Sequence, residues 1–557
     1  MTGPKLLVIG GVAGGASFAA RARRLCEDAT IILVERGPHV SFANCGLPYH
    51  IGGEIAERRK LLVQTPERLR AILNLDVRTN TEAVRIDRDR REVELRDLMS
   101  GRSYIETYDK LVLAPGAAPL RPPIPGIDRE GHFTLRNIPD LESIMTWIES
   151  RSARRAVVVG GGYIGLETAE QLHRRGLEVA VAEALPQVMA PLDPEMAAFL
   201  HAELRANGIA LHLGDPVAAF ESPAPGESAA ASVVMLKSGV RLPADIVILG
   251  LGVRPETDLA RVAGLEIGDA GGIRVDEQMR TSDPNIFAVG DAVEVRDAAT
   301  GAWTLIPLAG PANRQGRIAA DAIFGLPSRY TATQGTAIIR VFGLAAGCTG
   351  ANAKTLTRAG IPFEAIHLHP NSHAGYYPGA KPIALKVLFC PKSGKFLGAQ
   401  AVGADGVDKR IDVLATALKA GMTVDDLAEL ELAYAPPFGS AKDPVNLAGM
   451  IAQNVVAGRM EVAQWSEVSD GADGAPFVLL DVREKAEVEA GRIPGSIHIP
   501  LGELRARLGE LPRDREIIVH CQSGQRSYFA SRILAQRGFR VRNLTGSYKT
   551  WKAAVGA

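Results

Sequence analysis

The chain has 557 residues, enough for three or four domains with sizeable cores. Lys and Arg together number 63, as do Asp and Glu, so the formal net charge is zero and indicates neither a nucleic-acid nor a membrane partner. The five cysteines lack regular spacing, which predicts reduced thiols and a cytoplasmic location. The chain enters an apolar stretch within its first ten residues, so we expect no signal peptide. No apolar run approaches the roughly 18 residues of a membrane-spanning helix.

A strand–turn–helix–strand pattern opens the chain. Residues 6–9 predict a strand, a glycine-rich turn follows, and a second strand ends in Glu35. The turn departs from the G-x-G-x-x-G pattern because Val12, between Gly10 and Gly15, stands where the middle glycine is expected. Such a turn directs backbone amides of the helix N-terminus at a pyrophosphate, and the acid suits a ribose.

The same pattern restarts about 150 residues later. Gly160, Gly162 and Gly165 match G-x-G-x-x-G, where they form the tight turn, admit the pyrophosphate and allow the helix to pack on the strand. Tyr163 lies within this turn and is a further candidate for contact with the nucleotide. Glu183 ends the next strand, suits a ribose diol and would repel a 2′-phosphate. This pattern therefore predicts NADH rather than NADPH.

The two units predict an α/β protein with two Rossmann-like dinucleotide-binding domains, the second inserted in the first. Further along, the pattern predicts an α+β module with strands at 337–342 and 383–389 and a helix at 407–420. A polar stretch, 466–475, leads into a last compact α/β unit. The predicted limits are 1–150 and 276–329 for the first nucleotide domain, 151–275 for the second, 330–455 for the α+β domain and 462–557 for the last.

Two further segments resemble those of flavoproteins with two dinucleotide sites. Residues 281–291 resemble their second FAD fingerprint, in which Asp291 holds the ribityl chain. Residues 111–117 resemble their crossover segment, with Ala114 and Gly116 beside the cofactor and Pro115 in place of the usual Thr. Together with Glu35, these signals predict FAD.

Cys45 lies in residues 41–49, SFANCGLPY, without a second cysteine nearby. Flavin disulfide reductases with an internal disulfide commonly carry the second thiol five positions on, where this chain has His50. A lone redox cysteine must pair instead with sulfur or oxygen from a small substrate. We expect oxidised flavin and nearby donors to stabilise its thiolate. The alternative is a buried structural cysteine.

With these pieces in place, residues 1 to about 455 resemble a coenzyme A-disulfide reductase, a single-cysteine branch of the pyridine nucleotide-disulfide oxidoreductases. Residues 41–49, 373–379 and 434–443 carry the resemblance. It implies Cys45 on one flavin face, nicotinamide on the other, and a homodimer whose C-terminal modules contribute tyrosines across the interface. The matching positions are Tyr434, a possible proton donor to the leaving thiolate, and Tyr376 rather than Tyr377, because neighbours on a strand face opposite ways.

The resemblance also implies a binding surface for coenzyme A. The candidate residues are Ser17, Arg21 and Arg24 on the first helix, Ser41 and Asn44 beside the cysteine, and Lys442 of the partner subunit. Arg and Lys suit the phosphates of a coenzyme A nucleotide. Leu73 and Asn313 depart from the Lys and His of some members, and a solvated helix face is the alternative for each arginine.

Single-cysteine NADH oxidases and peroxidases are related enzymes. Peroxidases place a His in the first glycine-rich turn, where this chain has Ala13. This difference disfavours peroxide chemistry.

Residues from about 462 to 557 resemble a rhodanese domain. The resemblance is carried by residues 481–483, 491–500 and 517–527, the last of which predict a strand, a loop from Cys521 to Arg526, and a helix from Ser527. Converging loop amides should lower the pKa of Cys521 and stabilise a persulfide, with Arg526 adding charge. Phosphatase loops are similar but usually one residue longer, and an inactive regulatory domain is the other alternative.

The remaining cysteines, at 26, 348 and 390, are predicted to be apolar fillers. The closely spaced His367, His369 and His373 have strand-like positions that indicate a core edge or substrate rim, and we predict no metal.

The leading hypothesis is an FAD enzyme that uses NADH to reduce coenzyme A persulfide, polysulfide or coenzyme A disulfide, with a fused rhodanese that handles sulfane sulfur. Coenzyme A is then a substrate or a bound carrier. The alternatives are a plain coenzyme A-disulfide reductase with a vestigial tail, an NADH oxidase or peroxidase, and a non-enzymatic redox sensor or sulfur carrier.

Overall fold

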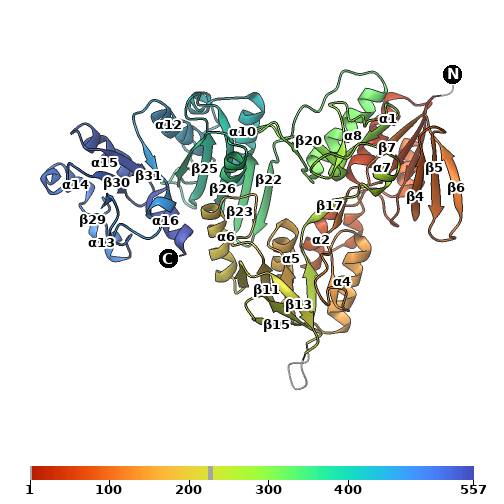
Figure 1. Cartoon of the computed structure of the whole chain (residues 1–557), viewed down its shortest axis with the longest axis horizontal. Coiled ribbons are helices and arrows are strands. Elements are labelled where there is room, and N and C mark those ends of the chain that lie inside the picture. Colours follow the sequence, from red (N-terminus) through yellow and green to blue (C-terminus); the bar gives the residue numbers. More distant parts are fainter. Residues whose placement is uncertain (1–2, 224–229, 557) are drawn as a thin grey trace. The chain divides into compact units, whose positions relative to one another are not determined.

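The computed structural model describes residues 3–223 and 230–556 (Figure 1). Contacts within the chain divide it into two compact units. The first comprises Met1–Pro186 and Ile209–Gly335, and the second comprises Gln187–Gly208 and Thr336–Ala557.

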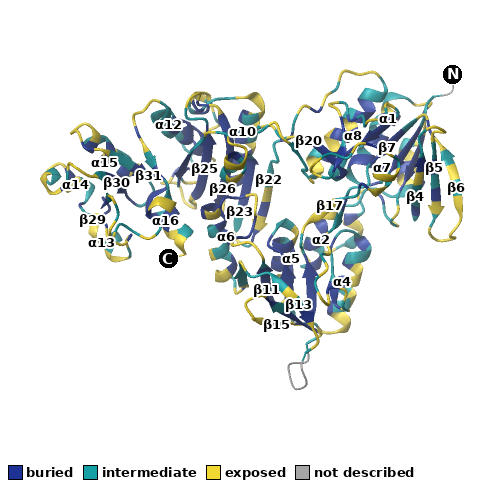
Figure 2. Ribbon diagram, viewed as in Figure 1, coloured by how far each residue is buried: buried dark blue, intermediate teal, exposed yellow. Residues whose placement is uncertain are grey.

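The first unit contains a five-stranded parallel sheet in the order β19-β7-β1-β2-β3. Its strands are β1 (Lys5–Ile9), β2 (Thr30–Val34), β3 (Asp76–Arg78), β7 (Lys110–Leu113) and β19 (Ile286–Ala288). The central strands are apolar runs buried on both faces (Figure 2), as in parallel sheets covered by helices. Helices α1 (Ala13–Leu25) and α8 (Ala309–Ile323) pack against each other. Because β19 pairs with β7, the chain returns to this sheet near residue 286.

A second parallel sheet in the same unit has the order β12-β11-β10-β16-β9. Its strands are β9 (His132–Phe133), β10 (Arg155–Val159), β11 (Glu178–Glu183), β12 (Ala210–Leu213) and β16 (Ile246–Leu249). Helix α5 (Tyr163–Arg174) follows β10 and packs on β10 and β11. Between β11 and β12 the chain contributes α6 (Pro194–Ala206) to the second unit.

The second unit contains a five-stranded antiparallel sheet in the order β22-β23-β26-β25-β24. Its strands are β22 (Ala337–Val341), β23 (Leu344–Gly350), β24 (Glu364–Leu368), β25 (Ile383–Phe389) and β26 (Phe396–Gly403). Every residue of β25 and β26 is buried. The accompanying helices are α10 (Val407–Ala420), α11 (Val424–Glu429) and α12 (Pro444–Val456).

A smaller parallel sheet ends the chain, in the order β27-β31-β30-β28-β29. Its strands are β27 (Val462–Ala463), β28 (Phe477–Asp481), β29 (Ile497–His498), β30 (Glu516–His520) and β31 (Val541–Leu544). Alternate residues of β28 and β30 belong to different apolar clusters, so both faces of the sheet are buried. The main helices here are α13 (Lys485–Glu489), α15 (Gln525–Ala535) and α16 (Ser547–Val555).

These sheets confirm the predicted fold class, and the predictions for 383–389 and 407–420 coincide with β25 and α10. Two local predictions are wrong. Tyr376 lies in a turn rather than on a strand. Helix α15 begins at Gln525, not Ser527, because Gly524 adopts a φ of 112° and starts the helix earlier. No helix among the described residues is long and apolar enough to cross a membrane.

Candidate active sites

The two glycine-rich turns have nearly the same geometry. Gly10 and Gly160 adopt positive φ angles of 101° and 107°. A Cβ at Gly10 would lie 2.0 Å from the carbonyl oxygen of Ala114, and one at Gly160 would lie 2.2 Å from that of Gly250. Only glycine therefore lets each turn approach the neighbouring strand end so closely. Apart from its chain neighbours, no described residue lies within 4 Å of a Cβ built on Gly162, so the turn leaves open space here that a pyrophosphate could enter.

An acid at the end of the second strand closes each turn. Glu35 accepts the amide hydrogens of Gly11 and Gly37, both at 2.8 Å. Glu183 accepts those of Gly161 at 2.6 Å and Leu185 at 2.7 Å. Both predicted ribose-binding carboxylates are thus fixed beside the turns that precede their helices. In each turn the helix begins inside the glycine motif, at Ala13 in α1 and at Tyr163 in α5.

The residues predicted to hold FAD fit a dinucleotide with a polyol chain. Val12 stands at the N-terminus of α1 and Gly15 in its first turn, whereas Gly165 takes the equivalent place in α5. Ala114 and Gly116 directly follow β7, and Asp291 follows β19, the neighbouring strand. Burial raises the pKa of Asp291, against the attraction of Arg136. A half-buried carboxylate of this kind is a suitable acceptor for hydroxyl donors.

Cys45 lies in a one-turn 3-10 helix, Asn44–Gly46, and its side chain is exposed. Its backbone amide donates to Asn44 Oδ1 at 3.0 Å, and its Sγ is 3.7 Å from the same oxygen. Ser41, at the start of the segment, donates its backbone amide to Gly11 O at 2.8 Å. The cysteine segment is therefore attached to the first glycine-rich turn.

The groups around Cys45 in one subunit have a net effect that disfavours its thiolate. Although the residue as a whole is exposed, partial enclosure of the thiol raises the pKa of Cys45, and the negative charges of Glu167 and Asp291 raise it further, against a smaller lowering effect of the Cys45 backbone amide. Glu167 was not anticipated from the sequence. It lies on α5 and accepts a hydrogen bond from Tyr49 at 3.1 Å. Within one subunit, the predicted stabilisation by nearby donors is therefore outweighed by burial and these two negative charges.

The residues of the first unit that were predicted to bind coenzyme A differ in whether their side chains are already paired within the protein. Ser17 Oγ donates to Asn313 Oδ1, and Arg21 pairs with Asp321 at 2.6 Å. Arg24 is exposed, with a guanidinium available for a phosphate. Arg23, by contrast, is buried and donates to carbonyl oxygens around the end of helix α3 (Pro66–Leu73). Of the three arginines, Arg24 best suits a phosphate.

Two tyrosines of the second unit share a hydrogen bond. Tyr376 Oη and Tyr434 Oη are 3.0 Å apart, and both side chains are exposed. This bond raises the pKa of Tyr376. Tyr377 instead packs edge-on against His373. The choice of Tyr376 over Tyr377 is thus consistent with the geometry, although a turn and not strand alternation separates them. Lys442, exposed, lies just before α12.

Cys521 directly follows β30, at the carboxyl end of the last parallel sheet. The amide of Gly524 donates to its Sγ at 3.1 Å. Burial opposes ionisation, but the hydroxyl of Ser527 and the amides of Ser527, Gly524 and Ser523 outweigh it and lower the pKa of Cys521. The loop therefore favours a thiolate through neutral donors, as predicted.

Arg526 is directed at a carboxylate. Its Nη1 and Nη2 atoms lie 2.6 Å and 2.7 Å from the two carboxylate oxygens of Glu487, on α13. This pair raises the pKa of Arg526 and lowers that of Glu487. The positive charge that Arg526 was predicted to add to the loop is therefore paired with the negative charge of Glu487. Glu487 was not anticipated from the sequence.

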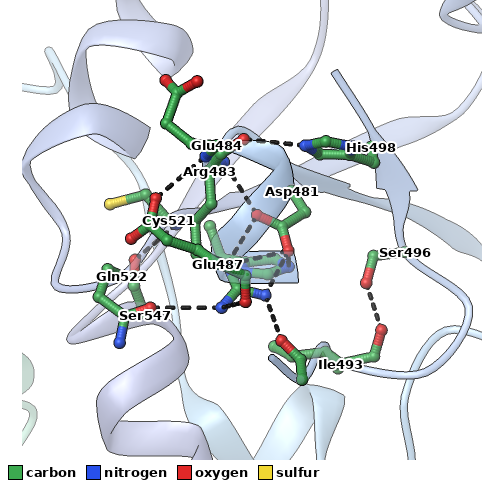
Figure 3. Close-up of polar contacts among 12 residues, drawn as sticks. Asp481, Arg483, Glu484, Glu487, Ile493, Ser496, His498, Cys521, Gln522 and Ser547 are labelled. Atoms are coloured by element: carbon green, nitrogen blue, oxygen red, sulfur yellow. Dashed lines mark hydrogen bonds and ion pairs between the residues drawn. The ribbon is translucent and has the colours of Figure 1, made fainter. Parts of the chain in front are cut away.

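A second guanidinium contacts the loop (Figure 3). Arg483 is buried and pairs with Asp481 at 2.7 Å. It also donates to the side chain of Gln522 at 3.2 Å and to the backbone oxygens of Glu487 and Gly491. Arg483 thus joins the loop to the segment that carries Glu487.

Comparison with known proteins places these sites in families. Residues 4–316 match the model "Pyridine nucleotide-disulphide oxidoreductase", residues 336–444 its dimerisation domain, and residues 464–554 the rhodanese-like domain. The crystal structure of reduced Bacillus anthracis CoADR-RHD is similar over 100% of this chain and 99% of its own, with 49% identity and a TM-score of 0.96. A NAD-dependent persulfide reductase from A. fulgidus is similar over 98% of this chain and 100% of its own, with 40% identity and a TM-score of 0.91.

A curated relative, the coenzyme A disulfide reductase of Staphylococcus haemolyticus, is 34% identical over 452 residues, covering 81% of this chain and 100% of the relative. The rhodanese-like match begins beyond residue 463 and accounts for the additional length here. The chain therefore belongs to the pyridine nucleotide-disulphide oxidoreductase family, as a flavoprotein reductase that uses FAD and NADH, acts on a sulfur group and carries a C-terminal rhodanese domain.

Proposed function

We propose that the chain is a cytoplasmic, homodimeric enzyme that uses NADH to reduce coenzyme A persulfide, polysulfide or coenzyme A disulfide through Cys45. The observation that carries the proposal is the exposed, free thiol of Cys45 beside the first glycine-rich turn, in a chain whose C-terminal domain retains its own cysteine. The persulfide reductase and coenzyme A disulfide reductase among its relatives support the substrate class.

The proposed reaction begins with Cys45 and a persulfide. Cys45 Sγ attacks the carbon-bound sulfur of coenzyme A persulfide, forms a mixed disulfide and releases hydrosulfide. Bound FAD supplies the two-electron chemistry that links NADH to sulfur. Two electrons then cleave the mixed disulfide and release the thiolates of Cys45 and coenzyme A. Overall, the persulfide, NADH and one proton give coenzyme A thiol, hydrogen sulfide and NAD⁺.

In this scheme the other candidate residues bind coenzyme A or protonate the leaving thiolate. Arg24 binds phosphate groups, with Ser17, Ser41 and Asn44 as polar contacts and Arg21 and Lys442 of the partner subunit as further candidates. Tyr434 of the partner subunit donates a proton to the leaving thiolate. The hydroxyls of Tyr376 and Tyr434 are hydrogen-bonded, and the pKa of Tyr376 is raised. Tyr376 is therefore a neutral hydrogen-bond partner of the proton donor Tyr434.

In this proposal the rhodanese domain transfers sulfane sulfur at Cys521. The lowered pKa of Cys521 and its neutral cradle suit a nucleophile that carries a persulfide. A plain reductase with a vestigial tail remains the second candidate. Replacement of Cys521 by Ser separates the two, because turnover that is unchanged on every sulfane substrate would favour the vestigial tail.

The experiment that tests the substrate is a steady-state comparison of coenzyme A persulfide, polysulfide and coenzyme A disulfide under NADH without oxygen. We expect the highest kcat/KM for a sulfane substrate. Oxygen and peroxide are assayed in parallel, because comparable turnover on either would favour the NADH oxidase or peroxidase alternative. Reduction of the flavin by NADH without turnover on any of these would indicate the non-enzymatic alternative.

A further inference from the structure

The Cys521 site has an unusual charge arrangement, because two guanidiniums flank the loop and each is paired with a carboxylate. Arg526 forms a two-pronged pair with Glu487, and Arg483 is paired with the buried Asp481. The groups that lower the pKa of Cys521 are the hydroxyl of Ser527 and backbone amides of the loop. The site thus stabilises negative charge mainly with neutral dipoles.

Glu487 holds Arg526 in an orientation fixed by its own helix. Its Oε2 atom accepts the backbone amide of Glu484 at 3.0 Å, within a capping box at the start of α13. The same carboxylate accepts hydrogen bonds from Nη1 and Nη2 of Arg526. The bond to Glu487 is the largest cause of the raised pKa of Arg526, whereas the charge of Cys521 is a smaller one. Arg526 therefore interacts weakly with the charge of the Cys521 sulfur, whereas its hydrogen bonds are made to Glu487.

This arrangement has a consequence for the sulfur donor. Thiosulfate brings two negative charges to the reacting end, whereas an alkyl persulfide brings at most one. A free arginine beside the loop would offset the additional charge of thiosulfate, but an arginine already paired with a carboxylate offsets little of it. Glu484, also beside this site, further raises the pKa of Arg526 by its negative charge.

We propose that Glu487 determines the donor class of the Cys521 site, favouring persulfides over dianionic thiosulfate by neutralising Arg526. The inference rests on the proposed sulfur transfer at Cys521. With thiosulfate, the thiolate of Cys521 takes the outer sulfur, a Cys521–sulfur bond forms, the bond between the two sulfurs of thiosulfate breaks, and sulfite leaves with its electron pair. With an alkyl persulfide, the same sulfur moves and an alkyl thiolate leaves. Cyanide then removes the sulfur as thiocyanate and restores the Cys521 thiolate.

The test is sulfur transfer to cyanide by the full-length holoenzyme without NADH, so that reduction at Cys45 makes no contribution. The donors are thiosulfate and the persulfide of 2-mercaptoethanol. In Glu487→Gln we expect kcat/KM for thiosulfate to rise about tenfold, as freeing one positive charge near the site implies, and kcat/KM for the persulfide to change less than about twofold. The matched control is Glu489→Gln, which removes an exposed carboxylate of the same helix whose partner is Lys485.

A second measurement does not depend on sulfur transfer. The rate of alkylation at Cys521, followed by mass spectrometry of its peptide, is compared for anionic iodoacetate and neutral iodoacetamide. Glu487→Gln should raise the iodoacetate-to-iodoacetamide ratio severalfold, and Glu489→Gln should leave it unchanged. An unchanged ratio in Glu487→Gln, or equal losses of both donor activities, would overturn the proposal and leave the pair a structural role. Absence of transfer from either donor in the wild type, with the expected change in the alkylation ratio, would remove the sulfur-transfer function and retain the electrostatic assignment.

Discussion

The backbone amide of His367, on β24, donates to Thr545 Oγ1 at 2.6 Å, and this bond joins the antiparallel sheet to the segment that supports Cys521. Nearby, His369 Nε2 lies 2.8 Å from Thr550 Oγ1. Between these two threonines, Ser547 Oγ accepts the backbone amide of Cys521 at 3.1 Å. The segment that contacts the cysteine loop through Ser547 is therefore itself bonded to the dimerisation domain.

Thr545→Val should loosen this support. Valine keeps the shape of threonine but leaves the buried amide of His367 without its acceptor, which costs about 1–3 kcal/mol. We expect slower alkylation of Cys521 and a higher apparent pKa in its pH profile. The control is Thr416→Val on α10, where the hydroxyl donates to a backbone oxygen of the same helix. A lower melting temperature with an unaltered Cys521 profile would mean that the bond stabilises the fold without positioning the loop.

Ser527→Ala tests the origin of the lowered pKa of Cys521. A depressed thiol pKa means that the thiolate persists to lower pH than in an ordinary cysteine, and that its reactivity is lost only as the pH falls through the lowered value. Removal of the hydroxyl should raise the pKa and slow alkylation near neutral pH about fivefold. Ser531→Ala, in the same helix, serves as the matched control, because its hydroxyl donates to Tyr528 O just as the Ser527 hydroxyl donates to Gly524 O. Equal pH profiles for the two variants would assign the effect to the backbone amides alone.

Glu167→Gln should lower the pKa of Cys45, whereas Ser527→Ala should raise that of Cys521. The negative charge of Glu167 raises the pKa of Cys45, so its removal should shift the pH dependence of Cys45 alkylation to lower pH, with a rate about threefold higher at pH 7. Glutamine retains an acceptor for Tyr49. Glu130→Gln, at an exposed pair with Arg151, is the control. If only the control moved the profile, the electrostatic assignment would be wrong.

Glu183→Ala should narrow the preference for NADH over NADPH. The carboxylate is fixed by two amides beside the second glycine-rich turn, where a 2′-phosphate would meet its charge. We expect the ratio of kcat/KM for the two nucleotides to fall about tenfold. Glu178→Ala, at the exposed beginning of the same strand, should leave the ratio near the wild-type value. A ratio insensitive to Glu183 would refute the argument from charge.

The sequence predicted those features that depend on local patterns. The turns at Gly10 and Gly160 require glycine because a backbone oxygen lies where a Cβ would be, so both could be recognised without a structure. The turn before α15 was also recognisable from its Cys521-to-Arg526 spacing. In each case the chemistry follows from residues close together in the chain.

Features that depend on distant residues were not predicted. The partner of Arg526 is Glu487, 39 positions away, and no short motif connected the two. The core-edge position predicted for His367 agrees with its burial, but its contact with Thr545 spans 178 positions. The raised pKa of Cys45 is due first to burial and then partly to Glu167, which approaches because α5 lies near the cysteine segment.

The most direct test of the account is Cys45→Ser in the FAD-loaded enzyme, assayed for NADH-driven release of hydrogen sulfide from coenzyme A persulfide. Cys521→Ser is measured in parallel as the matched single-thiol control. We predict that Cys45→Ser retains bound FAD and its reduction by NADH but loses sulfide release by at least about a thousandfold. Sulfide release at the wild-type rate by Cys45→Ser would contradict the central claim that this thiol receives sulfur from the substrate.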